Sequence, residues 1–278
     1  MALGAYALAD GHRVVCGGID THYLDVGSGH PVVLLHGSGP GVTAQSNWAG
    51  TIAGLSGHFR AIAPEMVGYG ATERPEGIRY GVATWVRHVV DFIDALGLER
   101  FDLVGNSMGG LVSLHIAQLH PQRVRRLALM GTPSPAFEPT EGLRALRSYE
   151  PSLDNMRRLI QDYFACDQSV VTDALVEARF EASNRPRVHE TYQAMFQDAR
   201  HAGNSLNLTE EGVRGIAAPT LILHGREDKV IPVGCAWTLS RLIRNSDTHI
   251  FANAGHWTQI ERRDLFNQLL VDFLGTAD

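Results

Sequence analysis

Short runs of apolar residues recur along the chain, each bounded by glycine, proline or aspartate. Runs of this length are typical of buried strands, and helical patterns fall between them. The alternation predicts an α/β fold with a mostly parallel central sheet and helices on both of its faces. The clearest predicted strands are Pro31 to Leu35, Ala61 to Ala63, Phe101 to Val104, Leu127 to Met130, Thr220 to Leu223 and Thr248 to Phe251.

Two helices are indicated by the same pattern. Apolar residues between Trp85 and Leu96 repeat at i, i+4 and i+8, and the repeat stops at Gly97. This predicts an amphipathic helix that ends at a glycine. A second helix is predicted from Leu111 to Leu119, where the chain continues after a glycine-rich turn.

The stretch from Thr132 to Ala218 has a different character. It opens with three prolines within eight residues, carries arginine-rich helical patterns and contains no convincing strand. Strand signals stand on both sides of it, so we expect a helical lid inserted into one α/β core. The predicted boundaries are 1–131 for the first part of the core, 132–218 for the lid and 219–278 for the second part of the core.

Composition and charge narrow the class of protein. The 278 residues are 44% hydrophobic and 19% charged, which fits one globular domain with an insertion. The 24 basic and 30 acidic residues give a net charge of -6 with no long run of either sign, which argues against a nucleic-acid partner. No stretch approaches the roughly 18 apolar residues that a membrane span needs, and residues 1–18 lack a signal-peptide pattern. We therefore expect a cytoplasmic protein with no membrane partner.

The cysteines indicate neither a disulfide framework nor a metal site. Cys16, Cys166 and Cys235 are odd in number, far apart and not arranged as CxxC. The histidines also lack metal-ligand spacing. The sequence thus predicts free thiols, no metal and no cofactor.

The predicted strand at Phe101 to Val104 leads directly into Gly105-Asn106-Ser107-Met108-Gly109-Gly110 and then into the second helix. A strand, a sharp turn and a helix are the context that a GxSxG nucleophile elbow requires. A surface turn is the alternative for a bare GxSxG, but this context favours the elbow. Ser107 is therefore the candidate nucleophile.

A serine hydroxyl needs a base within hydrogen-bond reach and an acid that orients the base. His256 lies in a turn after the last predicted strand, and Asp228 follows the predicted strand that begins at Thr220. The order Ser107, Asp228, His256 is the order that α/β enzymes with this elbow use. Glu227 is the adjacent competitor for the role of the acid.

An oxyanion hole requires fixed hydrogen-bond donors. The glycine-rich stretch from His36 to Gly41 follows a predicted strand, and we expect the backbone N–H of Ser38 to lie opposite that of Met108. A phosphate-binding loop is the rival interpretation. It is disfavoured because the GxGxxG spacing and a Walker lysine are both absent.

These motifs together resemble the α/β-hydrolase superfamily over essentially the whole chain. The closer resemblance is to meta-cleavage product hydrolases, which cleave a carbon–carbon bond in 2-hydroxy-6-oxo-hexa-2,4-dienoates. The residues that carry it are His36-Gly37-Ser38-Gly39-Pro40-Gly41, Ser46-Asn47, Gly105-Asn106-Ser107-Met108-Gly109-Gly110, Gly225-Arg226-Glu227-Asp228 and Gly255-His256-Trp257.

The resemblance implies roles for five further residues. Asn47, Asn106, Arg179 and Trp257 match residues that hold the dienoate in the family, and Phe164 matches a ring that lines the pocket. Arg179 would anchor the substrate carboxylate through its planar guanidinium, although a solvated lid arginine in a salt bridge is the alternative. The family also implies a small-molecule dienoate substrate, no cofactor, and a homo-oligomer that is a dimer or higher.

Two departures from the family pattern and two rival functions stay open. Glu65 stands where an aspartate is common in the wider superfamily, and Asn204 to Leu208 lacks a tryptophan that some members have. The same triad would also serve a carboxylesterase or lactonase, and a non-catalytic small-molecule receptor could retain the fold. The sequence leaves the preferred C6 substituent undetermined.

Overall fold

The computed structural model describes residues 11–198 and 208–276 of the chain. They contain one eight-stranded sheet in the order β1-β2-β4-β3-β5-β6-β7-β8. β2 pairs antiparallel with β1 and with β4, and all other neighbours are parallel. The strands are β1 (His12–Cys16), β2 (Ile19–Val26), β3 (Pro31–Leu35), β4 (Arg60–Pro64), β5 (Phe101–Asn106), β6 (Val124–Met130), β7 (Thr220–Gly225) and β8 (Ser246–Phe251).

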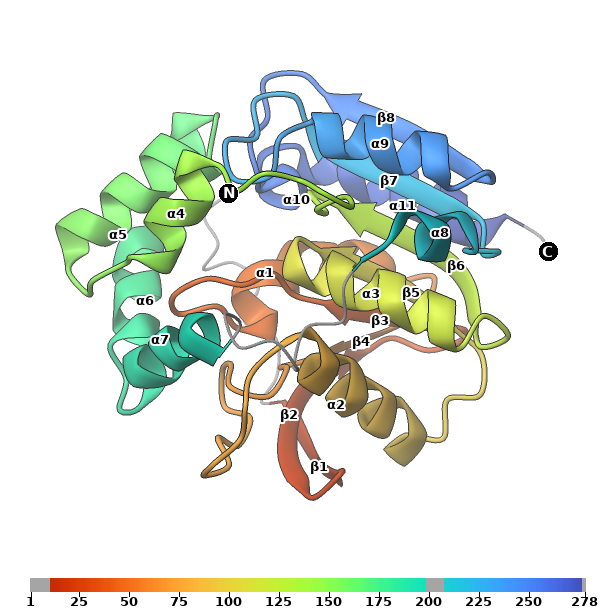
Figure 1. Ribbon diagram of the computed structural model, residues 1–278, viewed down its shortest axis with the longest axis horizontal. Helices are drawn as coiled ribbons and strands as arrows, with labels where there is room; N and C mark the ends of the chain where they lie inside the picture. The colour runs from red at the N-terminus through yellow and green to blue at the C-terminus, as the bar shows by residue number, and fades with distance from the viewer. Residues whose placement is uncertain (1–10, 199–207, 277–278) are drawn as a thin grey trace.

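Helices cover both faces of the sheet (Figure 1). α1, α10 and α11 pack against one face, and α2, α3, α8 and α9 pack against the other. Their bounds are α1 (Ala44–Leu55), α2 (Val82–Ala95), α3 (Met108–Leu119), α8 (Glu210–Arg214), α9 (Gly234–Leu242), α10 (Thr258–Glu261) and α11 (Arg263–Gly275). The predicted α/β fold is confirmed.

A group of helices between β6 and β7 gathers beside one end of the sheet, at the left of Figure 1. The described residues of this insertion contain no strand. Its elements are α4 (Glu141–Arg147), α5 (Leu153–Leu159), the π-helix η2 (Ile160–Phe164), the 3₁₀ turn η3 (Gln168–Val170), α6 (Asp173–Ser183) and α7 (Val188–Asp198). We refer to α4 through α7 as the helical insertion.

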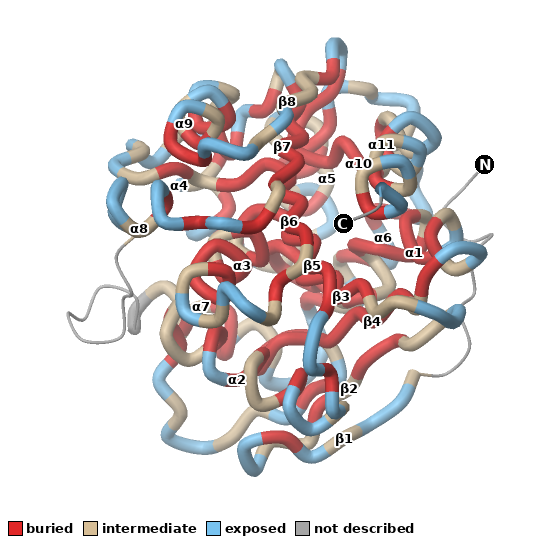
Figure 2. The backbone as a smooth tube through the Cα atoms, turned by 90° about the vertical axis from the view of Figure 1, so that its right-hand side faces the viewer, coloured by how far each residue is buried: buried red, intermediate tan, exposed pale blue. Residues whose placement is uncertain are grey.

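The pattern of burial explains why the central strands could be predicted. β5 and β7 are buried along their whole length, and Figure 2 shows the middle of the sheet as continuous buried chain. All six predicted strands are present, and α2 ends just before Gly97, whose φ of 64° terminates the helix. The pattern did not reveal β1 and β2 at the sheet edge, because β1 is buried only at Cys16 and β2 mixes buried with half-buried positions.

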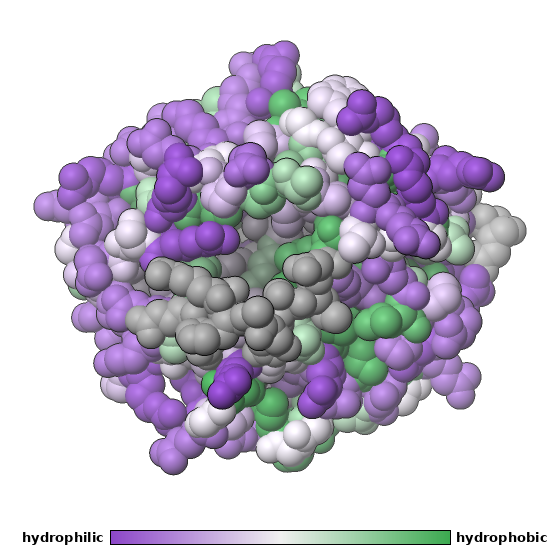
Figure 3. Space-filling model, viewed as in Figure 1, coloured by the Kyte–Doolittle hydropathy of each residue, from purple (hydrophilic) through white to green (hydrophobic). Residues whose placement is uncertain are grey.

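On the face drawn in Figure 3, the described surface is mostly hydrophilic, with limited hydrophobic areas. Among the described helices, none is both long enough and apolar enough to span a bilayer.

Candidate active site

Ser107 lies at the turn between β5 and α3 in a backbone conformation that non-glycine residues seldom adopt. Its φ is 54° and its ψ is -114°. The turn is held on both sides, because the Ser107 N–H donates to the Met130 carbonyl and the Leu111 N–H donates to the Ser107 carbonyl. Such strain persists only where the surroundings enforce it. The local geometry is that of the predicted elbow.

The glycines around Ser107 allow α3 to approach the sheet closely. A Cβ on Gly109 would collide with the carbonyl oxygen of Leu35 in β3, and a Cβ on Gly105 would collide with the carbonyl oxygen of Gly109. Only glycine avoids both collisions. The small residues of the motif thus place the start of α3 directly against the end of β3.

His256 and Asp228 form a buried pair at the ends of two neighbouring strands. His256 Nδ1 lies 2.7 Å from Asp228 Oδ2, and the two side chains are 2% and 0% exposed. Asp228 follows β7 and His256 follows β8. The pairing leaves His256 Nε2 as the ring nitrogen available for another partner, which is the arrangement that a histidine base requires.

The Asp228 carboxylate is fully occupied by donors. Its Oδ1 accepts from the N–H groups of Val230 and Ile231 at 2.8 and 2.9 Å, and His224 Nε2 lies 3.3 Å from Oδ2. Burial alone would raise the pKa of Asp228, but the charge on His256 and the hydrogen bonds from both histidines hold it well below its usual value. The carboxylate therefore stays ionised although it is buried.

Glu227, the competitor for the acid, faces elsewhere. Its Oε1 pairs with Arg226 at 2.9 Å and its Oε2 accepts from the N–H of Ala254. The structure thus brings Asp228, and not Glu227, to His256.

The loop after β3 lies beside the elbow and carries Ser38. The Tyr69 hydroxyl donates to Ser38 Oγ at 2.9 Å, which fixes the side chain of Ser38. The N–H of Met108 stands at the first position of α3, where a helix offers no internal acceptor. Ser38 and Met108 are therefore both candidates for donors to a developing oxyanion, as the sequence predicts.

The predicted substrate residues gather in one pocket between these loops and the insertion. The pocket includes Ser38 and His256 together with polar and aromatic side chains from α1, β5, η2, α6 and α10. These further lining residues include Asn47, Asn106, Phe164, Arg179, Trp257 and Gln259. Residues more than 200 positions apart in the chain thus share one enclosed space.

Arg179 is a buried cation in this pocket. Its side chain comes from α6 and the residue is 6% exposed, and its guanidinium lies 5.5 Å from the ring centroid of Trp257 and donates to Ser46 Oγ at 3.2 Å. Burial lowers its pKa to about 10. Among the described residues no acidic side chain pairs with it, and its Nε has no hydrogen-bond partner. Such a cation is suited to an anionic ligand.

Phe164 joins the insertion to the loop that carries His256. Its carbonyl accepts from the His256 N–H at 2.8 Å, and its ring contacts the rings of His256 and Trp257 at centroid distances of 5.5 and 5.0 Å. Phe164 ends the π-helix η2, a geometry that is common at functional sites. The insertion therefore contacts the candidate base directly.

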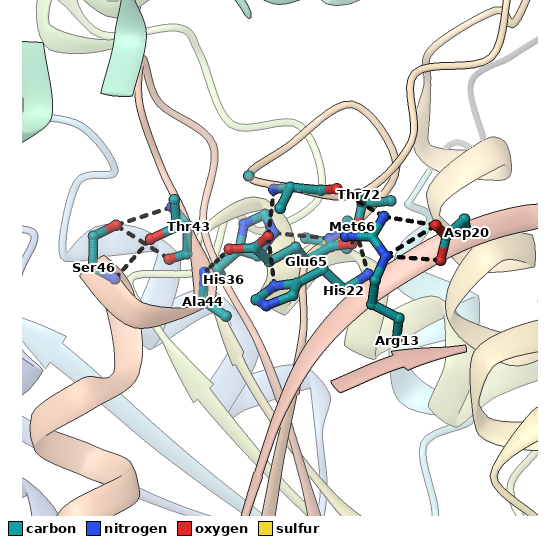
Figure 4. Close-up of polar contacts among 12 residues, drawn as sticks. Arg13, Asp20, His22, His36, Thr43, Ala44, Ser46, Glu65, Met66 and Thr72 are labelled. Atoms are coloured by element: carbon teal, nitrogen blue, oxygen red, sulfur yellow. Dashed lines mark hydrogen bonds and ion pairs between the residues drawn. The ribbon is translucent and has the colours of Figure 1, made fainter. Parts of the chain in front are cut away.

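Glu65 supports the loops behind the site (Figure 4). Its carboxylate accepts from the N–H groups of Ala44 and Ala71 at 3.2 and 2.6 Å and contacts His22 Nδ1 at 3.0 Å. It does not line the pocket of His256. The acidic residue after β4 thus fixes the start of α1 and the turn near Ala71.

The fold and this site define a class of protein. A family model described as the alpha/beta hydrolase fold matches residues 30–263. The chain belongs to the α/β-hydrolase fold family.

Comparisons with known proteins narrow the class. The chain is 51% identical over 269 residues to 2-hydroxy-6-oxo-2,4-heptadienoate hydrolase of Pseudomonas putida, covering 96% of this chain and 97% of that one. It is 45% identical to 2-hydroxymuconate semialdehyde hydrolase of a Pseudomonas species, with 96% and 95% covered. A solved meta-cleavage product hydrolase of Pseudomonas fluorescens, CumD, matches with a TM-score of 0.92 at 44% identity, covering 96% and 98%. Within the fold family, the chain is a member of the meta-cleavage product hydrolases.

Some side chains at the candidate site carry no signal in the sequence alone. Tyr69, His224 and Gln259 contact or line the site, but none of them belongs to a recognisable motif. In the stretch from Asn204 to Leu208, residues 204–207 lie outside the described residues, so the effect of the missing tryptophan stays a prediction.

Proposed function

We propose that this protein hydrolyses the carbon–carbon bond of 2-hydroxy-6-oxo-hexa-2,4-dienoates in aromatic degradation, with Ser107, Asp228 and His256 as its catalytic triad. One structural observation supports the proposal in addition to family membership. A buried arginine that has no acidic partner among the described residues shares a pocket with the histidine of a His–Asp pair. The pocket therefore combines nucleophilic chemistry with a site for a carboxylate.

The reaction begins with the bound dienol. It isomerises to the keto form, so that the carbon that leaves can depart as a stabilised carbanion. Ser107 Oγ then attacks the C6 carbonyl while His256 takes its proton, and the N–H groups of Ser38 and Met108 hold the oxyanion.

Cleavage of the C5–C6 bond leaves the electron pair on the dienoate fragment, which takes up the proton from His256 as 2-hydroxypenta-2,4-dienoate and so returns His256 to its neutral form. The C6 fragment remains as an ester of Ser107. Water activated by His256 hydrolyses this ester to a carboxylic acid. Asp228 fixes the ring of His256 and stabilises its charged form, and no metal or cofactor takes part.

The helical insertion serves as a lid over this chemistry. Arg179 in α6 and Phe164 in η2 reach into the pocket from it. A second cavity, between α1 and α6, shares Ser46, Leu175 and Arg179 with the pocket. We assign it as the path by which an anionic substrate reaches Arg179.

A panel of ring-cleavage products with different C6 substituents tests the proposal. Loss of their visible absorbance reports turnover, and the best substrate defines the C6 preference. Ser107→Ala should lower turnover by at least about a thousandfold while substrate binding persists, because the carboxylate contacts lie elsewhere in the pocket. The serine-to-alanine mutant of CumD complexed with acetates supports this choice of variant. Full activity of Ser107→Ala would refute the triad.

Arg179→Ala separates this reaction from ordinary ester hydrolysis. Loss of a hydrogen bond to a charged group costs about 1.5 to 3 kcal/mol. We expect kcat/KM for a 2-hydroxy-6-oxo-dienoate to fall by roughly ten- to a hundredfold. Hydrolysis of a neutral p-nitrophenyl ester should change little, since that ester has no carboxylate. An equal fall for both substrates would make Arg179 structural, and no fall for either would favour the esterase function.

A further inference from the structure

Within the part of the chain that the structure describes, three side chains in the pocket each keep one buried polar atom with no hydrogen-bond partner. These atoms are Asn47 Nδ2, Arg179 Nε and Gln259 Oε1. All three residues line the pocket of His256, and they are 9%, 6% and 3% exposed. A buried polar atom without a partner is costly, so such atoms in a pocket indicate the groups of the ligand that it binds.

The neighbouring hydrogen bonds fix which atom of each amide is free. The N–H of Gly37 donates to Asn47 Oδ1 at 3.2 Å, so Asn47 is left with a donor. Gln259 Nε2 donates to the backbone carbonyl of Asn47 at 3.3 Å, so Gln259 is left with an acceptor. Reversing either amide would place two donors or two acceptors against each other. The pocket thus offers two unused donors and one unused acceptor.

The substrate carries groups that match this set. An ionised carboxylate only accepts hydrogen bonds and suits Arg179 and Asn47, whereas a carboxylate oxygen against Gln259 Oε1 would be repelled. The hydroxyl on the adjacent carbon of the dienol can donate. We propose that Gln259 is a specificity-determining residue whose Oε1 accepts a hydrogen bond from the 2-hydroxyl group. This inference rests on the proposed function, since it assumes a 2-hydroxy-dienoate.

The placement of Gln259 follows from the fold. The short helix α10 begins at Thr258, two residues after His256, and its first turn brings Gln259 back to the same pocket. The ring of His256 and the amide of Gln259 are therefore positioned by one segment. Gln259 would therefore bind the 2-hydroxyl group beside His256, the proposed base.

The proposed bond acts on binding. It forms with the enol substrate and with the enol product, and it is lost in the keto intermediate, whose C2 oxygen can no longer donate. Removal of the acceptor should therefore raise KM without lowering kcat. A merely structural role would instead change stability and affect all ligands alike.

The experiment compares two ligands that differ only in the 2-hydroxyl. Freshly generated 2-hydroxypenta-2,4-dienoate and penta-2,4-dienoate are titrated by calorimetry into the wild type, Gln259→Met and Gln268→Met. Methionine retains the length of glutamine but lacks the strong acceptor, and Gln268 on the exposed side of α11 provides the same change outside the pocket. We expect the wild type and Gln268→Met to bind the hydroxylated ligand about tenfold more tightly. In Gln259→Met this preference should vanish while the affinity for penta-2,4-dienoate stays within about threefold.

The other outcomes are distinct. If Gln259→Met keeps the preference, or loses affinity for both ligands equally, the inference is overturned and the proposed function stands. If neither ligand binds to the wild type, the proposed function itself fails, and the inference fails with it. Circular dichroism and urea unfolding verify that the variant is folded, and Gln259→Leu replaces Gln259→Met if that variant does not fold.

Discussion

Asp228 and Glu227 are adjacent in the chain, yet their environments differ completely. Asp228 is buried and accepts from two backbone N–H groups as well as from His256. Glu227 lies at the surface side of the same turn and pairs with Arg226. The order of the residues and the position after a predicted strand together favour Asp228, and the direction in which each side chain leaves the turn gives the physical reason.

This contrast leads to a prediction about the triad acid. Asp228→Asn should lower kcat by about ten-thousandfold, because the amide cannot hold the tautomer and charge of His256. Glu227→Gln should change kcat by less than about threefold. Steady-state turnover of the two variants, with circular dichroism as a check on folding, tests this. A damaging Glu227→Gln beside a mild Asp228→Asn would reverse the assignment.

Some residues of the candidate site could be predicted from the sequence, and others could not. Ser107, Asp228 and His256 stand in turns after predicted strands, so the local sequence is enough to identify them as candidates. Gln259 and Tyr69 act through contacts with residues distant in sequence, such as Asn47 and Ser38. No local pattern encodes such contacts.

Among the elements, the insertion and the loop of His256 are joined by one carboxylate. Glu261, at the end of α10, accepts from the N–H groups of Cys166 and Asp167 through Oε2 and from that of Gly255 through Oε1. Burial raises the pKa of Glu261 despite these donors. The segment after η2 is therefore tied to the turn that holds His256.

Glu261→Gln should weaken this connection. The amide retains one acceptor but turns an NH₂ group toward a backbone N–H, which costs about 1–3 kcal/mol of unfolding free energy. We expect faster hydrogen exchange at the amides of Cys166 and Asp167. Glu210→Gln serves as the control. Glu210 forms an exposed i,i+4 pair with Arg214, so its substitution should change stability by less than about 0.5 kcal/mol. Unchanged exchange in Glu261→Gln would show that other contacts hold the insertion.

The strands that the pattern did not predict are the two at the sheet edge. β1 and β2 are joined by Gly17 and Gly18, whose φ values are 55° and 81°. Two glycines between two strands are a hairpin signal. The strands themselves mix polar and apolar residues because one side of the hairpin is exposed, so the apolar runs that revealed the central strands are missing there.

For the whole molecule, buried histidines couple stability to pH. The Val67 N–H donates to His88 Nδ1 at 3.2 Å, so the neutral ring carries its proton on Nε2, 2.8 Å from Thr21 Oγ1. Burial, assisted by the nearby His36, lowers the pKa of His88 to about 4. The unfolded chain takes up this proton near the ordinary value of 6.5, whereas the folded chain does not.

Stability should therefore fall as the pH drops from about 6.5 to about 4, because only the unfolded state binds the proton in that window. The contribution of His88 is at most about 1.4 kcal/mol per pH unit. Urea unfolding between pH 4.5 and 7 measures it. His88→Asn, which retains an acceptor for Val67, should be less stable at pH 7 but show a shallower pH dependence. An equal slope in both proteins would assign the acid sensitivity to other groups, such as His36.

The position of the helical insertion has an evolutionary consequence. It lengthens a crossover between β6 and β7, two neighbouring parallel strands, and α8 completes the return to the sheet. Loop-closure entropy grows slowly with length, by about 0.6 kcal/mol for each doubling. Ser107 precedes this segment in the chain, and Asp228 and His256 follow it. Descendants of one ancestor can thus exchange or resize the segment and acquire new substrates, while the inherited chemistry stays on an unaltered scaffold.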